Sequence, residues 1–299
     1  MAEGALHAFL DGEPESGLPS EAELDRVHDA LDPENEDEAV EVREEPVMEV
    51  LMRRVGQDMR AAAPALYEAV RPLLTHHGAL TRIRAVEAAA ALARLGGLEP
   101  DLSGAADMAE SRDEGAAIVL ALGGSGGDTT EFLTHADPAI RACAALAPCQ
   151  RGNPVATAEL VAALADPAGA DAWFTFRPAF FDGHVRSSLV RALADRSGPQ
   201  GAERLLPVLR AVAPFTTPLT AERDAGPLLT LAFAPRVRAE GPRDPVGDPS
   251  SLTDVQRAYL CVLAEADGFW SDRTADFAVV LARLGLPRDR EGVRALLDS

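Results

Sequence analysis

The chain has 299 residues, 47% of them hydrophobic, which is enough apolar material to bury a core and excludes disorder throughout. Most of the apolar residues are Ala, Leu and Val, aromatics make up only 5%, and Ala and Leu are the strongest helix formers, so the composition favours helices. The formal net charge is −20, which argues against nucleic acid as a partner.

The negative charge is concentrated at the start of the chain. Residues 1–45 hold 16 carboxylates against two arginines, a net charge of −14, which leaves −6 for the other 254 residues. A block of like charges is typical of a solvated, disordered arm, and it also attracts basic surfaces. We therefore expect residues 1–45 to form an acidic, partly disordered segment.

Two helices are predicted in and after this acidic segment. Ser20 and Glu23 form a capping box that predicts one short helix, which would end before Pro33. Pro46 suits the first position of a second, stronger helix. Its apolar stripe consists of Val47, Val50, Leu51 and Val55. We expect the folded body to span residues 46–299.

Two phrases of the sequence repeat, each with a short turn between its halves. Leu74-Thr75-His76 is followed by Ile83-Arg84-Ala85, and Leu133-Thr134-His135 is followed, two residues sooner, by Ile140-Arg141-Ala142. In both copies an apolar helix ends, a polar turn intervenes, and an Ala-rich helix begins with an aliphatic residue and an arginine. Such repetition indicates stacked pairs of helices. We predict that Ile83 and Ile140 are buried on the second helix of each pair.

A third copy of the phrase is interrupted by an insertion. It runs from Leu160 to Asp166-Pro167 and resumes at Val185-Arg186, with residues 168–183 between. Val185 should be buried like its counterparts. Beyond it, helices are predicted at 202–212 and 227–234, and three more helices follow Thr253.

The segment Asp137-Pro138-Ala139-Ile140-Arg141-Ala142, followed by Ala144-Ala145-Leu146, resembles the second-helix signature of the HEAT-repeat family. The resemblance covers about residues 46–197, and the phrases after Leu252 look like the C-terminal regions of actinobacterial HEAT-repeat proteins of unassigned role. A bacterial source also fits the use of Arg alone, without Lys, for all 28 basic residues. The resemblance implies an all-α fold, a right-handed α-solenoid of roughly six irregular helical hairpins, in which helices of 252–299 cap the C-terminal end.

Arg84, Arg141 and Arg186 follow the aliphatic residue in each copy of the phrase. The family resemblance implies that an arginine at this position pairs with an aspartate of a turn, and Asp137 and Asp166 stand where such partners would be. Arginine is also a common energetic centre of protein interfaces. The three arginines are therefore candidates either for a ladder of ion pairs between repeats or for contact with a partner.

Five of the chain's 14 aromatic residues fall within nine residues of the insertion. They are Trp173, Phe174, Phe176, Phe180 and Phe181. Aromatic side chains gathered on a loop suggest an anchor for a partner or a lid over a pocket. The alternative is that the loop folds back and fills a groove of its own protein, and the sequence leaves both open.

Other residues with chemical potential fit structural roles better. Gly123-Gly124-Ser125-Gly126-Gly127 matches the G-x-S-x-G pattern of a nucleophilic serine, but that motif needs a preceding strand and here a helix is predicted. His76, His135 and His184 fall in turns too far apart to share a metal ion. We predict no catalytic residue, metal or cofactor.

The three cysteines, Cys143, Cys149 and Cys261, have no zinc-ligand spacing and are odd in number, which favours reduced thiols. The first ten residues show no signal-peptide pattern, and no apolar run reaches the ~18 residues of a membrane span. These features predict a cytoplasmic protein with no membrane partner.

The pattern as a whole favours a non-catalytic scaffold, adaptor or inhibitor that holds another protein on the concave face of its second helices. The acidity would suit a partner with a basic surface. The alternative is a HEAT-like enzyme related to DNA glycosylases, which would need a basic groove and a carboxylate beside aromatic residues. Asp171 and Asp182 lie near Trp173, yet the body is acidic and lacks lysine. The sequence does not predict the oligomeric state.

Overall fold

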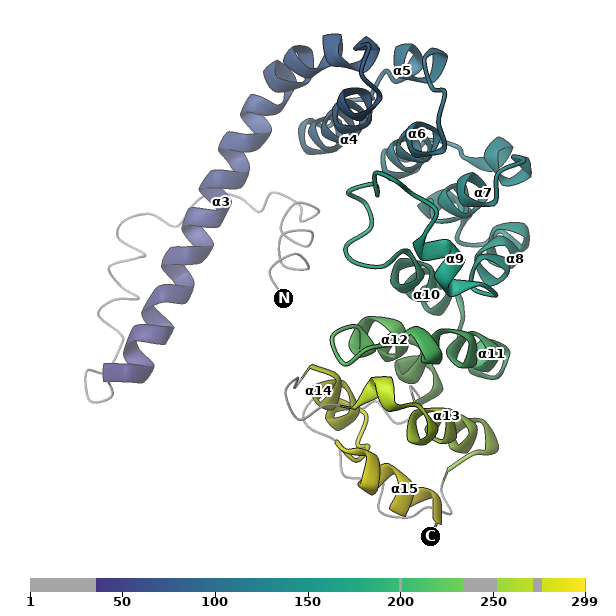
Figure 1. The fold of residues 1–299 in the computed structure, drawn as a ribbon. Helices are drawn as coiled ribbons and strands as arrows, with labels where there is room; N and C mark the ends of the chain where they lie inside the picture. Colours follow the sequence, from purple (N-terminus) through teal and green to yellow (C-terminus); the bar gives the residue numbers. More distant parts are fainter. Residues whose placement is uncertain (1–35, 199–200, 234–251, 271–275, 299) are drawn as a thin grey trace.

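The computed structural model describes residues 36–198, 201–233, 252–270 and 276–298 (Figure 1). Every regular element within these ranges is an α-helix or a 3-10 helix, and no strand occurs among them. The predicted all-α fold is confirmed. The short helix expected after Ser20 lies outside the described residues.

Six or fewer residues join most neighbouring elements, whereas 13 residues separate α9 from α10. The α-helices are α3 (Glu36–Val70), α4 (Ala79–Gly96), α5 (Ser103–Asp107), α6 (Arg112–Gly124), α7 (Pro138–Ala145), α8 (Pro154–Ala163), α9 (Pro167–Asp171), α10 (Val185–Arg196), α11 (Ala202–Val212), α12 (Ala221–Phe233), α13 (Asp254–Glu265), α14 (Asp276–Arg283) and α15 (Arg290–Asp298). The 3-10 helices are η1 (Arg71–Thr75), η2 (Thr130–Thr134), η3 (Pro148–Gln150), η5 (Ala213–Phe215) and η8 (Asp267–Phe269).

Successive helices pack on one another in chain order. Contacts join α4 to α6, α6 to α7, α7 to α8, α8 to α10, α10 to α12 and α12 to α14. Figure 1 shows α4, α6, α10 and α12 on the side of the body that faces the long helix α3, with α8, α11 and α13 on the opposite side. We call α4, α6, α10 and α12 the inner helices.

The predicted core positions are buried. Ile83, Ile140 and Val185 are exposed by 1%, 4% and 1%, which confirms that these residues face the interior. Ile83 belongs to an apolar cluster formed by α3, α4 and α6. Ile140 and Val185 belong to a second cluster that continues from α6 through α15. No single helix pair could bury these faces alone, so each pair depends on its neighbours.

The two repeated phrases align without a gap, which corrects the predicted register. Arg82 donates to the carbonyl of His76 at 2.7 Å, and Arg141 donates to the carbonyl of His135 at 2.8 Å. Each arginine stands six residues after its histidine, so Arg82, and not Arg84, is the counterpart of Arg141. The two Ile-Arg-Ala triplets are identical in sequence, but they do not occupy equivalent positions in the structure. The hydrogen bond from the arginine to the preceding turn identifies the equivalent residues.

Two predicted helix starts are too late because both were placed at a proline. Helix α3 begins at Glu36, so Pro46 and the predicted boundary between segments 1–45 and 46–299 both fall inside it. Helix α12 begins at Ala221 and contains Pro227. A proline in a helix interior costs about 3 kcal/mol, which flanking turns of good helix formers and tertiary contacts can offset.

Other predicted helix boundaries agree with the structure. Helix α13 follows Thr253 as predicted, and the structure shows that Thr253 and Gln256 form a capping box at its start. Gly285 has a φ of 70° after α14, the left-handed conformation that a helix-ending glycine adopts. Helix α11 spans the predicted residues 202–212.

Arginine–carboxylate pairs join consecutive helices across the stack. The pairs are Arg82–Glu114 between α4 and α6, Arg112–Asp137 (2.6 Å) between α6 and α7, Arg141–Glu159 (2.8 Å) between α7 and α8, and Arg186–Asp224 (3.0 Å) between α10 and α12. Arg141 and Arg186 thus form ion pairs between helices, but with Glu159 of α8 and Asp224 of α12 and not with the turn aspartates that the resemblance implies. Asp137 pairs with Arg112. Asp166 instead caps α9 by accepting from the Gly169 amide at 3.0 Å.

The Arg82–Glu114 pair is the one most removed from solvent at the start of the stack, with side-chain exposures of 7% and 4%. Glu114 also accepts from the Ser111 hydroxyl at 2.8 Å in the capping box of α6. Burial alone would raise the pKa of Glu114, but the bonds from Ser111, Arg82 and the Glu110 amide outweigh it and hold the pKa below its usual value.

We predict that Arg82→Met destabilises the protein by about 3–5 kcal/mol, because it leaves the Glu114 carboxylate buried without its cation. Arg54→Met is the matched control: the Arg54–Asp58 pair is exposed by 65% and 70%, and losing it should cost under about 1 kcal/mol. Urea unfolding measures both. Equal losses in the two variants would contradict a structural role for the buried pair.

The same pair predicts a pH dependence. A carboxylate with a lowered pKa stabilises the folded state above its unfolded pKa of about 4.3 and loses this effect as the pH falls through the lowered value. The stability gap between the wild type and Arg82→Met should therefore be full at pH 6 and shrink in acid. A gap that stays constant down to about pH 2 would show that Glu114 contributes no charge to it.

Candidate partner-binding groove

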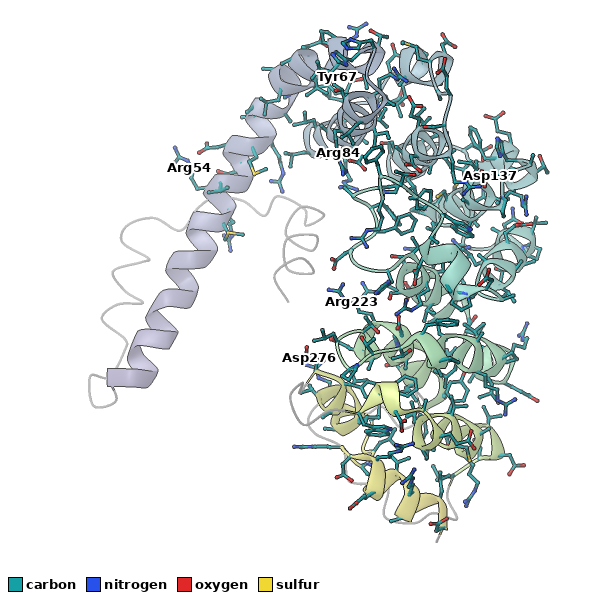
Figure 2. The ribbon with its side chains drawn as sticks, in the orientation of Figure 1. Arg54, Tyr67, Arg84, Asp137, Arg223 and Asp276 are labelled. Atoms are coloured by element: carbon teal, nitrogen blue, oxygen red, sulfur yellow. The ribbon has the colours of Figure 1, made fainter. Side chains whose placement is uncertain are left out.

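A groove of about 700 Å³ opens between the inner helices and the loop that precedes α10. Residues of α4, α6 and α10 line it, and the loop forms one rim through Pro178, Ala179, Phe180 and Asp182. We call this cavity the inner groove, and residues 172–184 the aromatic loop. Arg223 of α12 completes the lining, and Figure 2 shows it on the side of the body that faces α3.

The groove exists because its floor consists of small residues. Ala90 on α4 and Ala117, Ala121 and Gly124 on α6 line the cavity, and the three residues of α6 recur at helical spacing, so small side chains form much of its floor. Alanine favours helix formation while leaving space that a leucine would fill. The floor is therefore apolar and formed by rigid elements.

The aromatic loop divides its side chains between core and solvent. Phe181 is buried at 3% exposure, and Phe174 stacks on it with ring centroids 5.7 Å apart. Trp173 meets Phe174 edge to face at 6.2 Å and packs against the core. Phe176 and Phe180 remain exposed. Trp173, Phe174 and Phe181 therefore fold back onto their own protein, as one of the two interpretations expected. Phe176 and Phe180 remain available to a partner.

Hydrogen bonds fasten the aromatic loop over the inner helices. The Phe176 amide donates to Asp113 of α6 at 2.7 Å, and the Ala179 amide donates to Glu87 of α4, also at 2.7 Å. At its other end Arg223 of α12 binds the Asp182 carboxylate at 2.9 Å. The loop thus bridges helices that are far apart in the sequence, and its rim position is fixed before any partner binds.

Charges of both signs surround the groove. The six charged lining residues are Glu87, Arg94, Asp182, Arg191, Asp195 and Arg223. Glu87 and Asp182 already accept hydrogen bonds within the protein. The guanidinium groups of Arg94 and Arg191 make no hydrogen bond or ion pair with other residues in the described ranges. These two arginines were not among the predicted site residues, because only the fold places them at one cavity.

The predicted arginines do not gather at the groove. Arg186 has a side-chain exposure of 3% and binds Asp171 and Asp224, so it lies inside the protein. Asp224, exposed by 0%, also accepts from Ser187 at 2.6 Å and Thr220 at 2.8 Å. These bonds compensate the buried charge and tie α9, α10 and α12 together.

The other two predicted arginines differ in exposure. The Arg141 side chain is exposed by 26% and is paired with Glu159. Arg84 is exposed by 53% and binds Glu87 within its own helix at 2.6 Å. Arg84 also borders a separate, shallow hollow beside Leu73 and Leu80. Among the three, Arg84 alone has a largely exposed guanidinium.

Neither the serine motif nor the histidines form a reaction centre among the described residues. Ser125 is the C-terminal cap of α6, so a helix and not a strand precedes it. His76 and His135 each accept a backbone amide of their own turn through Nδ1 at 3.0 Å. His184 lies 3.2 Å from Asp171. No group of three His, Cys, Asp or Glu residues that could hold a metal ion occurs in the described ranges.

Comparison with protein-family models, with curated proteins and with solved structures found no match. Among the described residues, no helix combines the length and apolar character needed to cross a membrane.

We predict opposite outcomes for two adjacent phenylalanines. Phe181→Ala should create a cavity costing about 3–5 kcal/mol and lower the melting temperature by about 10 °C. Phe180→Ala removes a side chain exposed by 50% and should leave the melting temperature nearly unchanged. Differential scanning calorimetry compares them. Equal melting temperatures would refute the division of the loop between core and surface.

Proposed function

We propose that the protein is a non-catalytic scaffold, adaptor or inhibitor that holds a segment of another protein in its inner groove. The observation that carries the proposal is the groove itself: about 700 Å³, with an apolar floor of small residues and a rim that includes exposed Phe180. A concave, preformed cavity of this kind suits a ligand that inserts side chains between rigid helices.

We infer that the body is a right-handed α-solenoid of HEAT-like helical hairpins. Helices that pack in chain order and an arginine pair at successive junctions support this arrangement. In such a fold the second helices of the hairpins form an extended surface, and their spacing sets the width of the groove.

The rim fits the recognition of a polypeptide. An exposed aromatic side chain at the edge of an apolar cavity is a common centre of binding energy in protein interfaces. Unpaired Arg94 and Arg191 offer hydrogen-bond donors to main-chain carbonyls or carboxylates of a bound segment. Because hydrogen bonds already hold the aromatic loop, little ordering of the loop would oppose binding.

The partner we propose is a protein with a basic surface, attracted by the −14 charge of residues 1–45. We propose neither nucleic acid nor a membrane as a partner, and no cofactor. A cytoplasmic location fits the three cysteines, which are free thiols.

A HEAT-like enzyme related to DNA glycosylases is less well supported. Such an enzyme needs a carboxylate free to act beside aromatic residues and a basic groove for phosphates. Asp182 is bound to Arg223 and Asp171 to Arg186, and the groove lining has equal numbers of acidic and basic residues. The geometry therefore favours binding over base excision.

We predict that Ala91→Trp, which places an indole at the groove, weakens capture of the partner by at least about tenfold, equivalent to about 1.4 kcal/mol. Ala91 is exposed, so the fold should tolerate the change. Val161→Trp is the control, at an exposed position on the opposite helix α8. The assay is affinity capture from the native host with quantitative mass spectrometry. Partners that are captured equally by both variants would contradict the proposal.

A further inference from the structure

The inner groove contains hydrogen-bond donors that its own protein leaves unused. Arg94 of α4 and Arg191 of α10 line the cavity and are exposed, and neither guanidinium is paired with another residue that the structure describes. Ser188 of α10 also lines the cavity, and its hydroxyl likewise has no hydrogen bond to the described part of the chain. A guanidinium group donates hydrogen bonds and accepts none, and a hydroxyl can do both. We call these three residues the groove donors.

The acidic residues of the groove cannot balance both arginines. Glu87 and Asp182 already accept bonds from groups of their own protein. Of the three carboxylates in the lining, Asp195 alone has no bond or ion pair with a described residue, and it stands one helical turn after Arg191 on α10. One carboxylate balances the charge of one guanidinium. At least one arginine of the groove is therefore left without an anion.

The two arginines lie away from the aromatic loop, towards the other end of the groove. On α4, Arg94 follows Glu87, which binds the loop, by seven residues, about 10 Å along the helix. On α10, which begins where the loop ends, Arg191 follows Val185 by six residues, about 9 Å. The Nη1 atom of Arg94 lies 4.0 Å from the point where a side chain on Gly124 would begin, so this guanidinium reaches the last residue of α6. The apolar floor thus lies between an aromatic rim at one end and two cations at the other.

Any polypeptide segment that fills the groove removes water from these cations. A charged group that loses its water must gain a partner, because an unpaired charge in a desolvated site is strongly unfavourable. A main-chain carbonyl accepts a hydrogen bond but leaves the positive charge unbalanced. A carboxylate balances the charge and also accepts the two parallel bonds that a guanidinium donates. The groove donors therefore favour a segment that contains an acidic residue.

We propose that the segment held in the inner groove is acidic. An aspartate or glutamate of the partner binds Arg94 and Arg191, and apolar side chains beside it lie over the alanine floor towards Phe180. This inference rests on the proposed function and adds the chemistry of the segment that binds. The contact is separate from residues 1–45, whose negative charge attracts a basic surface of the same partner. The partner thus presents charges of opposite sign to two parts of the protein.

Peptide display on the full chain tests the proposal without a known partner. A phage library of random dodecapeptides is panned in parallel against the wild type and against Ala91→Trp, whose indole is designed to fill the groove. Peptides recovered on the wild type and lost on Ala91→Trp are ligands of the groove. We expect these peptides to be enriched, relative to the input library, in an Asp or Glu next to apolar residues.

Titration of one such peptide, followed by fluorescence anisotropy, separates charge from shape. Arg94→Gln with Arg191→Gln should raise its dissociation constant at least about tenfold, and replacing the acidic residue of the peptide by its amide should remove most of this difference. Arg204→Gln with Arg210→Gln is the matched control. Both of these arginines are exposed on α11 outside the groove, and the change in net charge is the same, so the dissociation constant should stay within about twofold.

The outcomes distinguish the acidic segment from the groove itself. Groove peptides without an acidic residue, or a peptide that both double variants bind equally well, overturn the acidic segment and leave the groove as a binding site. Peptide recovery that Ala91→Trp does not change contradicts the groove, and the proposed function with it. If residues 1–45 or a second copy of the chain fill the groove, the wild type recovers no acidic peptide, which also overturns the proposal.

Discussion

The arginine–carboxylate pairs between neighbouring helices are the constraint on which the arrangement depends. Alanine-rich helix faces bury apolar area, but their short side chains interlock little with a neighbouring helix. Many relative positions of two such helices would therefore have similar energies. A buried arginine needs its carboxylate at one place, because losing that partner costs several kcal/mol. Arg82 with Glu114, and Arg186 with Asp224, therefore fix where α6 lies on α4 and α12 on α10.

The groove likewise results from the small side chains on the inner helices. Small residues that allow the inner helices to approach one another also leave the space above Ala117 and Ala121 empty. The aromatic loop covers part of this space. Phe181 packs into the core, and the backbone amides of Ala179 and Phe176 donate hydrogen bonds to Glu87 and Asp113, which hold the loop in place. What remains is a cavity with an apolar floor and a rim that combines Phe180 with charged side chains, a composition suited to recognising a polypeptide.

Much of the fold could be predicted because it is encoded locally. The repeated phrases predicted that Ile83 and Val185 are buried, and the helix expected after Thr253 is α13. The predicted alignment of the two repeats was wrong, because the identical Ile-Arg-Ala triplets equated Arg84 with Arg141, whereas Arg82 is the structural counterpart of Arg141. The difference lies in a hydrogen bond to the preceding turn, which a triplet of residues does not reveal. The starts of α3 and α12 were also predicted incorrectly, because a proline was expected to stand at the first position of each helix. Neighbouring helix-forming residues offset the free-energy cost of a proline in the helix interior.

The site was less predictable, because it is assembled from distant segments. No pattern in the sequence links Arg94, Ala121 and Arg191, which line one cavity only after α4, α6 and α10 have stacked. The sequence shows that aromatic residues are clustered in the insertion. A loop has no helical periodicity, however, so the sequence could not predict which of these side chains are buried and which are exposed. Phe180 and Phe181 are neighbours in sequence and opposite in burial.

The most direct test of the central claim, that the inner groove holds another protein, is site-specific photo-cross-linking in the native cell. A photoreactive benzoylphenylalanine at position 180 should become joined to one protein at the rim of the groove, and the same group at Val161 should not. The partner peptide recovered by mass spectrometry would define what the groove holds. Cross-links from position 161 with none from position 180 would place the binding surface on α8, away from the inner groove, and contradict the account.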